Sequence, residues 1–234
     1  MPPTLSVLIP ALNEAANLRA AVRGVLGIVD QVGLDAEVII LSCFDKNGSG
    51  DGTVEVARRL AAEDRRVSTV HVDGYQSLGM KFRAGILLAS GTHLILIPGD
   101  NEFVPASMKR VFEHIGRADM ILCYTANPEI RPWHRRIASG IYIHALNILF
   151  FHRIKYYNGT NVYRTEDLRQ VLPGTDSFAV LAEIVLRLLH AEKTYIEIPV
   201  LVQPRQGHSK AFKLDHAIRV ILDILKLRLG LGSQ

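Results

Sequence analysis

Short apolar segments alternate with segments of helical spacing through the first half of the chain, and this alternation constrains the fold more than any other feature. The apolar segments are near-continuous in Val, Ile and Leu, and they cover residues 5–9, 37–41, 67–72 and 93–97. The intervening segments place apolar residues at helical intervals, and they cover residues 14–26, 53–62 and 81–89. This order predicts an α/β fold with a mainly parallel sheet, helices on both faces, and strands buried on both sides.

The second half of the chain continues with helices and strands in a less regular order. Helices are expected over residues 105–114, 136–154, 177–190 and 211–229, and strands over residues 120–124, 158–164 and 195–202. The chain has 234 residues and shows no internal repeat or low-complexity linker. It therefore fits one domain over residues 1–210, followed by a C-terminal amphipathic helix over residues 211–234.

Composition excludes several classes of protein. The formal net charge of +4 is mild, and the aromatic residues, at 7%, are not interleaved with basic clusters, so nucleic acid is not an expected partner. The first residues run directly into an apolar segment without the features of a signal peptide, and no stretch of 18 residues lacks polar breaks. Two cysteines without metal-ligand spacing suit a reducing compartment. A cytoplasmic location is therefore expected.

An acidic turn, Gly99-Asp100-Asn101-Glu102, follows the fourth apolar segment. Ligands of such sheets bind beyond the carboxyl ends of the strands, where residues 10–14, 43–53, 75–81 and 99–102 are expected to gather. Carboxylates two residues apart, at Asp100 and Glu102, suit Mg²⁺ or Mn²⁺, which prefer oxygen ligands and share them with substrate phosphates. Taken alone, a solvated acidic loop explains the pair at least as well.

Two loops on the same side have both a functional and a structural explanation. Asn13 and Glu14 either bind a ribose or a base, or they cap a helix whose first turn favours negative charge. The Gly-rich loop 45–53 either approaches a nucleotide or is a plain turn before a capped helix. It lacks the lysine and the spacing of a phosphate-binding P-loop.

Two later features are equally open. Arg205 and Lys210 flank Gly207, so this segment either binds a phosphate or forms an exposed basic loop. Glu183 lies among apolar residues of the expected helix 177–190. It is either a charge on the helix surface or a base in a cleft with a raised pKa.

Four motifs in a fixed order carry a resemblance to a known family. They are LIPALNEAANL at residues 8–18, GSGDGT at residues 48–53, GMKFRAG at residues 79–85 with ASG at residues 89–91, and Asp100-Asn101-Glu102. In this order they resemble the family 2 glycosyltransferases, which have the Rossmann-like GT-A fold. The last motif stands where that family carries its D-x-D metal motif.

Later segments are similar to one branch of that family, the polyprenyl-phosphate sugar synthases of the dolichol-phosphate mannosyltransferase type. Residues 136–139 (RIAS) with Asn147 resemble the acceptor-side helix of the branch, and Phe178 with Glu183 resembles its F-x(n)-E helix. Residues 197–200 (EIPV) resemble its E-[IV]-P strand, and Arg205, Gly207, Ser209 and Lys210 resemble its R-x-x-G-x-S-K tail.

The resemblance implies a metal-dependent, inverting hexosyltransferase with a GDP- or UDP-sugar donor and a polyprenyl-phosphate acceptor. It implies that Asp100 and Glu102 hold Mg²⁺ or Mn²⁺ and that Asp100 takes part in catalysis. The implied donor-binding residues are Pro10, Leu12, Asn13, Glu14, Asp45, Asn47, Gly79, Lys81, Asp100 and Asn101. The implied phosphate-binding residues are Arg136, Arg205 and Lys210.

Two positions depart from the family pattern. Lys46 and Asn47 stand where two aspartates usually precede the Gly-Ser of the second motif, and the loop is longer, which leaves Asp45 as the candidate acid for the base. Glu102 stands where the metal motif has its second aspartate, so oxygen ligation is retained with a longer side chain. The identity of the donor base therefore stays open.

Other functions and partners also stay open. A soluble or saccharide hydroxyl acceptor would need a general base, for which Glu183 is the candidate. A nucleotide-sugar-binding module without catalysis would fit the altered second motif. The apolar segments 136–154 and 211–229 fit either a membrane surface, with peripheral attachment to its cytoplasmic face, or packing within the domain or in a homodimer.

Overall fold

The computed structural model describes residues 3–204, 224, 227 and 228, and this part of the chain forms a seven-stranded sheet in the order β3-β2-β1-β4-β6-β5-β7. The strands are β1 (Leu5–Ala11), β2 (Ala36–Cys43), β3 (Val67–Val72), β4 (His93–Leu96), β5 (Met120–Thr125), β6 (Val162–Arg164) and β7 (Tyr195–Val200). The helices are α1 (Leu18–Val32), α2 (Thr53–Glu63), α3 (Leu78–Leu88), α4 (Pro105–Phe112), η1 (Pro128–Ile130), α5 (Trp133–Phe150), α6 (Thr165–Gln170) and α7 (Val180–His190).

The sheet is mainly parallel, with one reversed strand. β1 lies between β2 and β4 and is parallel to both, and β3 is parallel to β2. β6 runs antiparallel to β4 and β5, whereas β7 is parallel to β5. The predicted α/β class is therefore confirmed, and the reversal at β6 is a feature that apolar periodicity does not predict. The carboxyl ends of β1, β2 and β4 meet at one edge, where a ligand site is expected.

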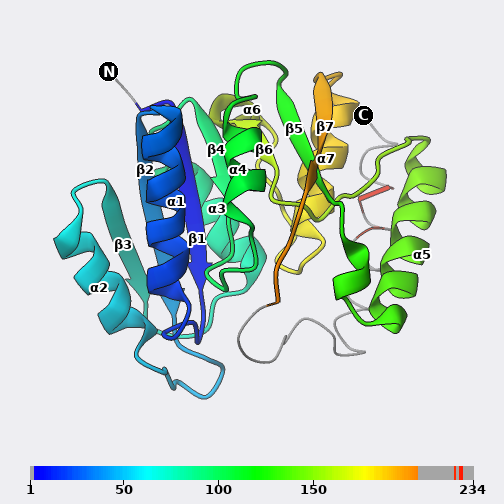
Figure 1. Ribbon diagram of the computed structural model, residues 1–234. Helices are drawn as coiled ribbons and strands as arrows, with labels where there is room; N and C mark the ends of the chain where they lie inside the picture. Colours follow the sequence, from blue (N-terminus) through cyan, green and yellow to red (C-terminus); the bar gives the residue numbers. More distant parts are fainter. Residues whose placement is uncertain (1–2, 205–223, 225–226, 229–234) are drawn as a thin grey trace.

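Helices cover both faces of the sheet (Figure 1). α1, α2 and α4 pack on one face, where their apolar side chains share a core with β1, β2 and β4. α3, α6 and α7 pack on the opposite face with the alternate residues of the same strands. β1 shows this alternation directly, because Val7 and Ile9 belong to the first core and Leu8 to the second.

Helix α1 begins at Leu18, four residues later than the apolar spacing predicts. Asn13 has a left-handed backbone with φ of 56°. The N–H of Glu14 donates to the Thr53 hydroxyl at 2.8 Å, and the N–H of Ala15 donates to the Asp51 carboxylate at 3.1 Å. These two N–H groups are bound to the first residue of α2 and to the loop before it, and they do not open a helix. The expected start at residue 14 is therefore wrong, because distant residues capture the local backbone.

Helix α5 begins three residues before, and ends four residues before, the expected range 136–154. Pro132 precedes its first turn, and Phe151 follows its last turn in a left-handed conformation with φ of 59°. The Asn147 side chain then donates to the Ile154 carbonyl at 2.9 Å and accepts from the Ile154 N–H at 3.0 Å. This pair of bonds turns the chain back toward the domain, so the helix stops although the sequence remains apolar.

Other differences are smaller. The expected strand 158–164 is reduced to β6, and α6 was not predicted because its six residues hold too few apolar positions to define a period. Most of the expected helix 211–229 lies outside the described residues. Ile224 and Leu227 are buried and helical, and they pack into the core beside α5 and α7. Within the described residues, no helix is both long and apolar enough to cross a membrane.

Candidate active site

The acidic turn follows β4 and is tied to the segment after β7. Asn101 has a left-handed backbone with φ of 56°, and the N–H of Glu102 donates to Asp100 Oδ1 at 3.3 Å. The Gln203 N–H donates to the Glu102 carbonyl at 2.8 Å, and the Gln203 side chain donates to the Asn101 carbonyl at 2.9 Å. The backbone of the turn that carries the two carboxylates is therefore hydrogen-bonded both by Asp100 within the turn and by Gln203 after β7.

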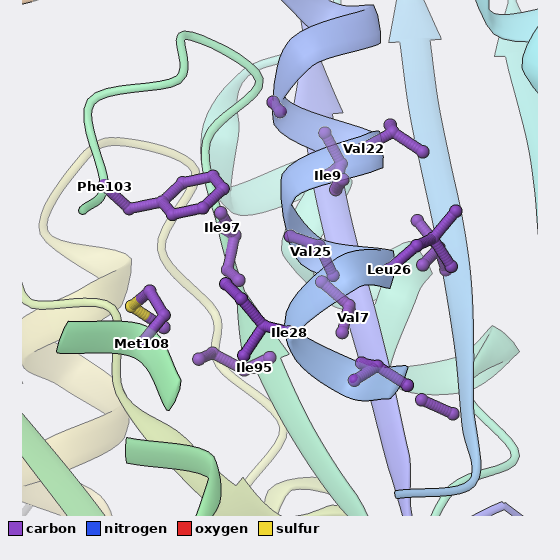
Figure 2. Close-up of a cluster of buried hydrophobic side chains, with 14 of the residues drawn as sticks. Val7, Ile9, Val22, Val25, Leu26, Ile28, Ile95, Ile97, Phe103 and Met108 are labelled. Atoms are coloured by element: carbon purple, nitrogen blue, oxygen red, sulfur yellow. The ribbon is translucent and has the colours of Figure 1, made fainter. Parts of the chain in front are cut away.

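Phe103 anchors the same turn in the hydrophobic core (Figure 2). Its ring lies among Ile97 of the turn after β4, Met108 of α4 and the residues of α1, and Phe103 is 7% exposed. A Cβ on Gly24 of α1 would lie 3.2 Å from the ring, so the absence of a side chain at this position leaves room for Phe103. Burial of the aromatic ring directly after Glu102 fixes where the acidic pair sits relative to the sheet.

Asp100 and Glu102 line a hollow of about 120 Å³ at the carboxyl edge of β4 and β5. Arg131, which follows η1, also lines the hollow, and its guanidinium donates to the Tyr156 hydroxyl at 3.1 Å. Asn158 also lines the hollow. The lining of the hollow is mainly apolar, and its polar part brings together Asp100, Glu102, Arg131 and Asn158. Two acidic residues and an arginine suit a ligand with a cation and phosphate groups.

The donor set fits a divalent cation held partly by substrate. Among the described residues, no group of three or more His, Cys, Asp or Glu side chains forms a complete metal cage. Mg²⁺ is commonly bound by one or two carboxylates together with substrate phosphates, so the pair Asp100 and Glu102 matches that pattern. Both residues already take part in interactions within the protein.

The sequence pattern described as Glycosyl transferase family 2 matches residues 6–172, which is more than two thirds of the chain and includes β1 through β6. The chain belongs to glycosyl transferase family 2. The acidic turn, the hollow beside it and the loops after β1 and β2 all lie within or against the matched segment.

A curated relative is the undecaprenyl-phosphate 4-deoxy-4-formamido-L-arabinose transferase of Aeromonas hydrophila subsp. hydrophila. It is 28% identical over 138 residues, which make up 58% of this chain and 41% of the relative. The chain therefore spans about two fifths of the length of this curated relative.

Solved structures of glucosyl-3-phosphoglycerate synthase from Mycobacterium tuberculosis share the fold. One, in complex with Mn²⁺, uridine diphosphate and phosphoglyceric acid, has a TM-score of 0.73 at 17% identity and covers 97% of this chain and 78% of its own. Another, with Mg²⁺ and uridine diphosphate, has a TM-score of 0.69 at 16% identity and covers 96% and 79%. At this identity the likeness establishes the family fold for this chain and nothing finer.

Several of the residues that family resemblance assigned to the donor lie together at the edge formed by β1, β2 and α3. Lys81, only 3% exposed, donates from Nζ to the Ala11 carbonyl at 3.0 Å, at the end of β1. Burial lowers the pKa of Lys81. Gly79 opens α3 beside it, and Glu14 is held against Thr53 of α2. Asn13, Glu14 and Lys81 do not line the hollow, but the end of β1 lies beside the acidic turn, because a Cβ on Gly99 would lie 3.7 Å from the Pro10 carbonyl oxygen.

The loop that carries the altered second motif is closed by Asp45. β2 ends at Cys43, so Asp45 lies two residues beyond the strand within a loop that it closes itself. Its carboxylate accepts from the N–H groups of Asn47 at 2.8 Å and Ser49 at 2.9 Å. The Asp45 carboxylate therefore stabilises its own loop in this structure, and the binding of a nucleobase by Asp45 stays a prediction.

Glu183 does not have the raised pKa that a general base in a cleft would need. It is 3% exposed on α7, and burial acts to raise its pKa. Opposing this, its carboxylate accepts from the N–H groups of Gly174 and Thr175, both at 2.9 Å, and from Arg187 Nε at 2.8 Å. These bonds outweigh burial and lower the pKa of Glu183, so neither alternative drawn from the sequence, a charge on the helix surface or a base with a raised pKa, describes this buried carboxylate. Its assignment to catalysis stays a prediction.

Glu183 instead supports the loop that the donor-side helix packs against. A Cβ on Gly79 would lie 2.1 Å from the Thr175 carbonyl, and the Gly79 N–H donates to the Asp176 carbonyl at 3.1 Å. Arg83 of α3 also pairs with Asp176. The carboxylate of Glu183 therefore holds a loop that positions the start of α3, where Lys81 lies.

The predicted phosphate-binding residues are not gathered at the hollow. Arg136 lies in the first turn of α5 and does not line it, and Arg205 and Lys210 lie outside the described residues. Arg131 and Tyr156 line it instead. Sequence patterns did not identify these two, because they are 25 residues apart and meet only through tertiary packing.

Gly159 provides a test of how tightly this wall is packed. A Cβ at this position would lie 2.0 Å from the Cys123 carbonyl and 2.8 Å from Asn161 Oδ1, both in the buried part of the β5–β6 region. We expect Gly159→Ala to lower the free energy of unfolding by about 2 kcal/mol or more, measured by urea denaturation. Gly27→Ala in α1, with open space around the new Cβ, should instead be neutral or stabilising by up to about 1 kcal/mol. Equal stabilities for the two variants would contradict the packing described for Gly159.

Proposed function

We propose that this family member transfers a hexose from a nucleotide-diphosphate sugar to a polyprenyl phosphate, with inversion at the anomeric carbon. The observation that carries the proposal is the hollow in which Asp100 and Glu102 face a common space with Arg131. Two carboxylates suit a cation shared with a diphosphate, and a guanidinium suits a second phosphate group. The named activity of the undecaprenyl-phosphate relative supports the same acceptor class.

In this proposal the protein binds and orients two anionic reactants. Asp100 and Glu102 hold Mg²⁺ or Mn²⁺, which when bound supplies charge neutralisation for the diphosphate leaving group. Asn13, Glu14 and Lys81 bind the donor from the edge formed by β1 and α3, together with the other donor residues named above. Arg205 and Lys210 add to phosphate binding. Residues 1–210 form the catalytic domain, which acts at the cytoplasmic face of a membrane.

The acceptor in this proposal needs no strong base. A phosphate monoester is already an anion at neutral pH, so it attacks the anomeric carbon without losing a proton to the protein. A hydroxyl acceptor would need a base. The lowered pKa of Glu183 and its hydrogen bonds to Gly174, Thr175 and Arg187 favour the phosphate over the hydroxyl.

The proposal is tested by incubating the full chain with GDP-, UDP-, CDP- and dTDP-sugars, Mn²⁺ and either polyprenyl phosphate or the corresponding polyprenol. Mass spectrometry should find a polyprenyl-phosphate sugar in the first case and no product from the alcohol. Arg131→Ala should raise KM for polyprenyl phosphate by about 10- to 100-fold, because a hydrogen bond to a charged group contributes about 1.5–3 kcal/mol. KM for the donor should stay unchanged.

Arg117→Ala is the matched control, because this arginine is exposed between α4 and β5 and away from the hollow. Transfer to a soluble hydroxyl acceptor but not to polyprenyl phosphate would replace the proposal with a soluble-acceptor enzyme. Donor binding without transfer or donor hydrolysis would instead indicate a binding module.

A further inference from the structure

One face of helix α5 exposes a stripe of large apolar side chains. The stripe consists of Trp133, Ile137, Ile141 and Ile148 on the helix and Phe151 at its end, which are 71%, 54%, 66%, 62% and 85% exposed. The intervals between the isoleucines and the tryptophan are multiples of about one helical turn, so these side chains lie on the same side of α5. Trp133, Ile137 and Ile141 follow one another at one-turn intervals, the exposed His144 stands between Ile141 and Ile148, and grouped exposed apolar side chains of this kind mark interaction sites.

The domain uses the opposite side of α5. Leu146 is buried, and Tyr142, Ile143, Leu149 and Phe150 are partly buried against the core beside α7. Figure 1 shows α5 at the end of the molecule opposite α2, set apart from the layers that cover the sheet. One side of α5 therefore packs against the domain, and the other side, which carries the stripe, is exposed.

The segment around the stripe is basic. Residues 131–155 contain no Asp or Glu, and they contain Arg131, Arg135, Arg136, Arg153 and Lys155. Arg136 and Arg153 are exposed, as are the helix residues His134 and His144. A second hollow, of about 340 Å³, lies at the end of α5 between His144, Ile148 and Arg153. Cations thus flank the apolar stripe at both ends of the helix.

We propose that this face of α5 docks on the surface of an anionic lipid bilayer, with the stripe at the boundary of headgroups and acyl chains. α5 buries one apolar side in the domain and exposes a second side that carries a tryptophan and isoleucines with arginines nearby, and these are residue types found where helices contact the membrane interface. The opposite charges of the arginines and the headgroups provide the complementarity. Lipid binding by this face does not depend on which acceptor the enzyme uses.

The same charges disfavour a second copy of the chain as the occupant. In a symmetric dimer the same patch would meet itself, so Arg136 and Arg153 would approach cations of the partner without acidic residues from α5 to offset them. An anionic surface removes this repulsion. The position of Arg131, which precedes α5 and lines the hollow at Asp100, also brings the proposed site close to the docked surface.

Vesicle flotation of the full chain tests the proposal. Vesicles of phosphatidylcholine with phosphatidylglycerol should carry the protein to the top of the gradient, and vesicles of phosphatidylcholine alone should carry much less. Binding should fall as salt is added, because exposed charges are screened. The variant Ile137→Gln/Ile141→Gln/Ile148→Gln should reduce partitioning by about tenfold or more, because it removes apolar area that would be buried in the interface.

The matched control is Leu87→Gln, a change of the same kind at a leucine that is 65% exposed on α3. It should bind vesicles like the wild type, and circular dichroism should show the same fold for all variants. Absence of flotation, equal flotation of the triple variant, or a triple variant that only dissociates a dimer in sedimentation velocity would each overturn the proposal. The readout contains no transfer step, so its failure is distinguishable from a failure of the proposed reaction.

Discussion

Replacing Asp100 with asparagine is expected to lower the turnover of sugar transfer by about 10³-fold or more. Changes in residues that merely orient a metal ligand cost about 10- to 100-fold, so loss of a charged ligand should cost more. Asparagine keeps the shape of the side chain and one oxygen for the Glu102 N–H, so the turn should keep its structure. Initial rates at saturating donor and Mn²⁺, with thermal melting of both proteins, would measure the two effects separately.

The control for this change is Glu166→Gln on α6, whose carboxylate is 73% exposed and forms only a 3.8 Å pair with Arg169. It should keep full activity. A Glu102→Gln variant should lose activity in the same direction as Asp100→Asn. If Asp100→Asn transferred sugar at a rate within a few fold of the wild type, the acidic turn would have no part in binding the metal or the diphosphate.

Replacing Glu183 with glutamine is expected to destabilise the fold strongly. The substitution puts an amide N–H₂ where a buried oxygen accepts from Gly174, Thr175 or Arg187, and it leaves the Arg187 cation without its partner. Breaking such a buried, charge-assisted group costs about 3 kcal/mol, which for a chain of this size corresponds to a fall in Tm of about 6–12 °C. Thermal and urea unfolding would measure it.

The pH dependence of the stability difference between wild type and Glu183→Gln supplies an independent readout. Because the folded-state pKa of Glu183 lies below its ordinary value of 4.5, its contribution to stability is fully present above pH 4.5. The contribution is lost as the pH falls through the lower folded-state pKa, so wild type and Glu183→Gln should converge in stability at acidic pH. A variant with wild-type stability and an abolished kcat would instead indicate that Glu183 is the general base.

The strands were largely predictable because each is a short apolar run that the sheet buries. β3 has the predicted bounds, β1 starts as predicted and ends two residues later, and β2 starts one residue earlier and ends two residues later. The start of α1 was not predictable from local spacing, because Thr53 and Asp51 bind the N–H groups of Glu14 and Ala15 from a distant part of the chain. The spacing of apolar residues along the sequence does not indicate long-range hydrogen bonds of this kind.

The residues of the candidate site likewise fall into those that the sequence predicts and those that it does not. Asp100 and Glu102 were identified from their place after an apolar strand, and the structure places both on the wall of a hollow. Arg131 and Tyr156 were missed because neither belongs to a motif. The environment of Glu183 was left open between two alternatives, because the backbone N–H groups of the loop before α7 that lower its pKa cannot be located from side-chain spacing.

Thermal shift of the wild type with GDP, UDP, CDP and dTDP, each with and without Mn²⁺, tests the central claim most directly. At a concentration near 100 times Kd, a ligand stabilises the folded state by about 2.7 kcal/mol, or about 5–11 °C for a chain of this size. The account predicts such a shift with at least one nucleotide, only in the presence of Mn²⁺, and its loss in Asp100→Asn/Glu102→Gln. No shift with any nucleotide, or an equal shift without metal and in the double variant, would contradict it.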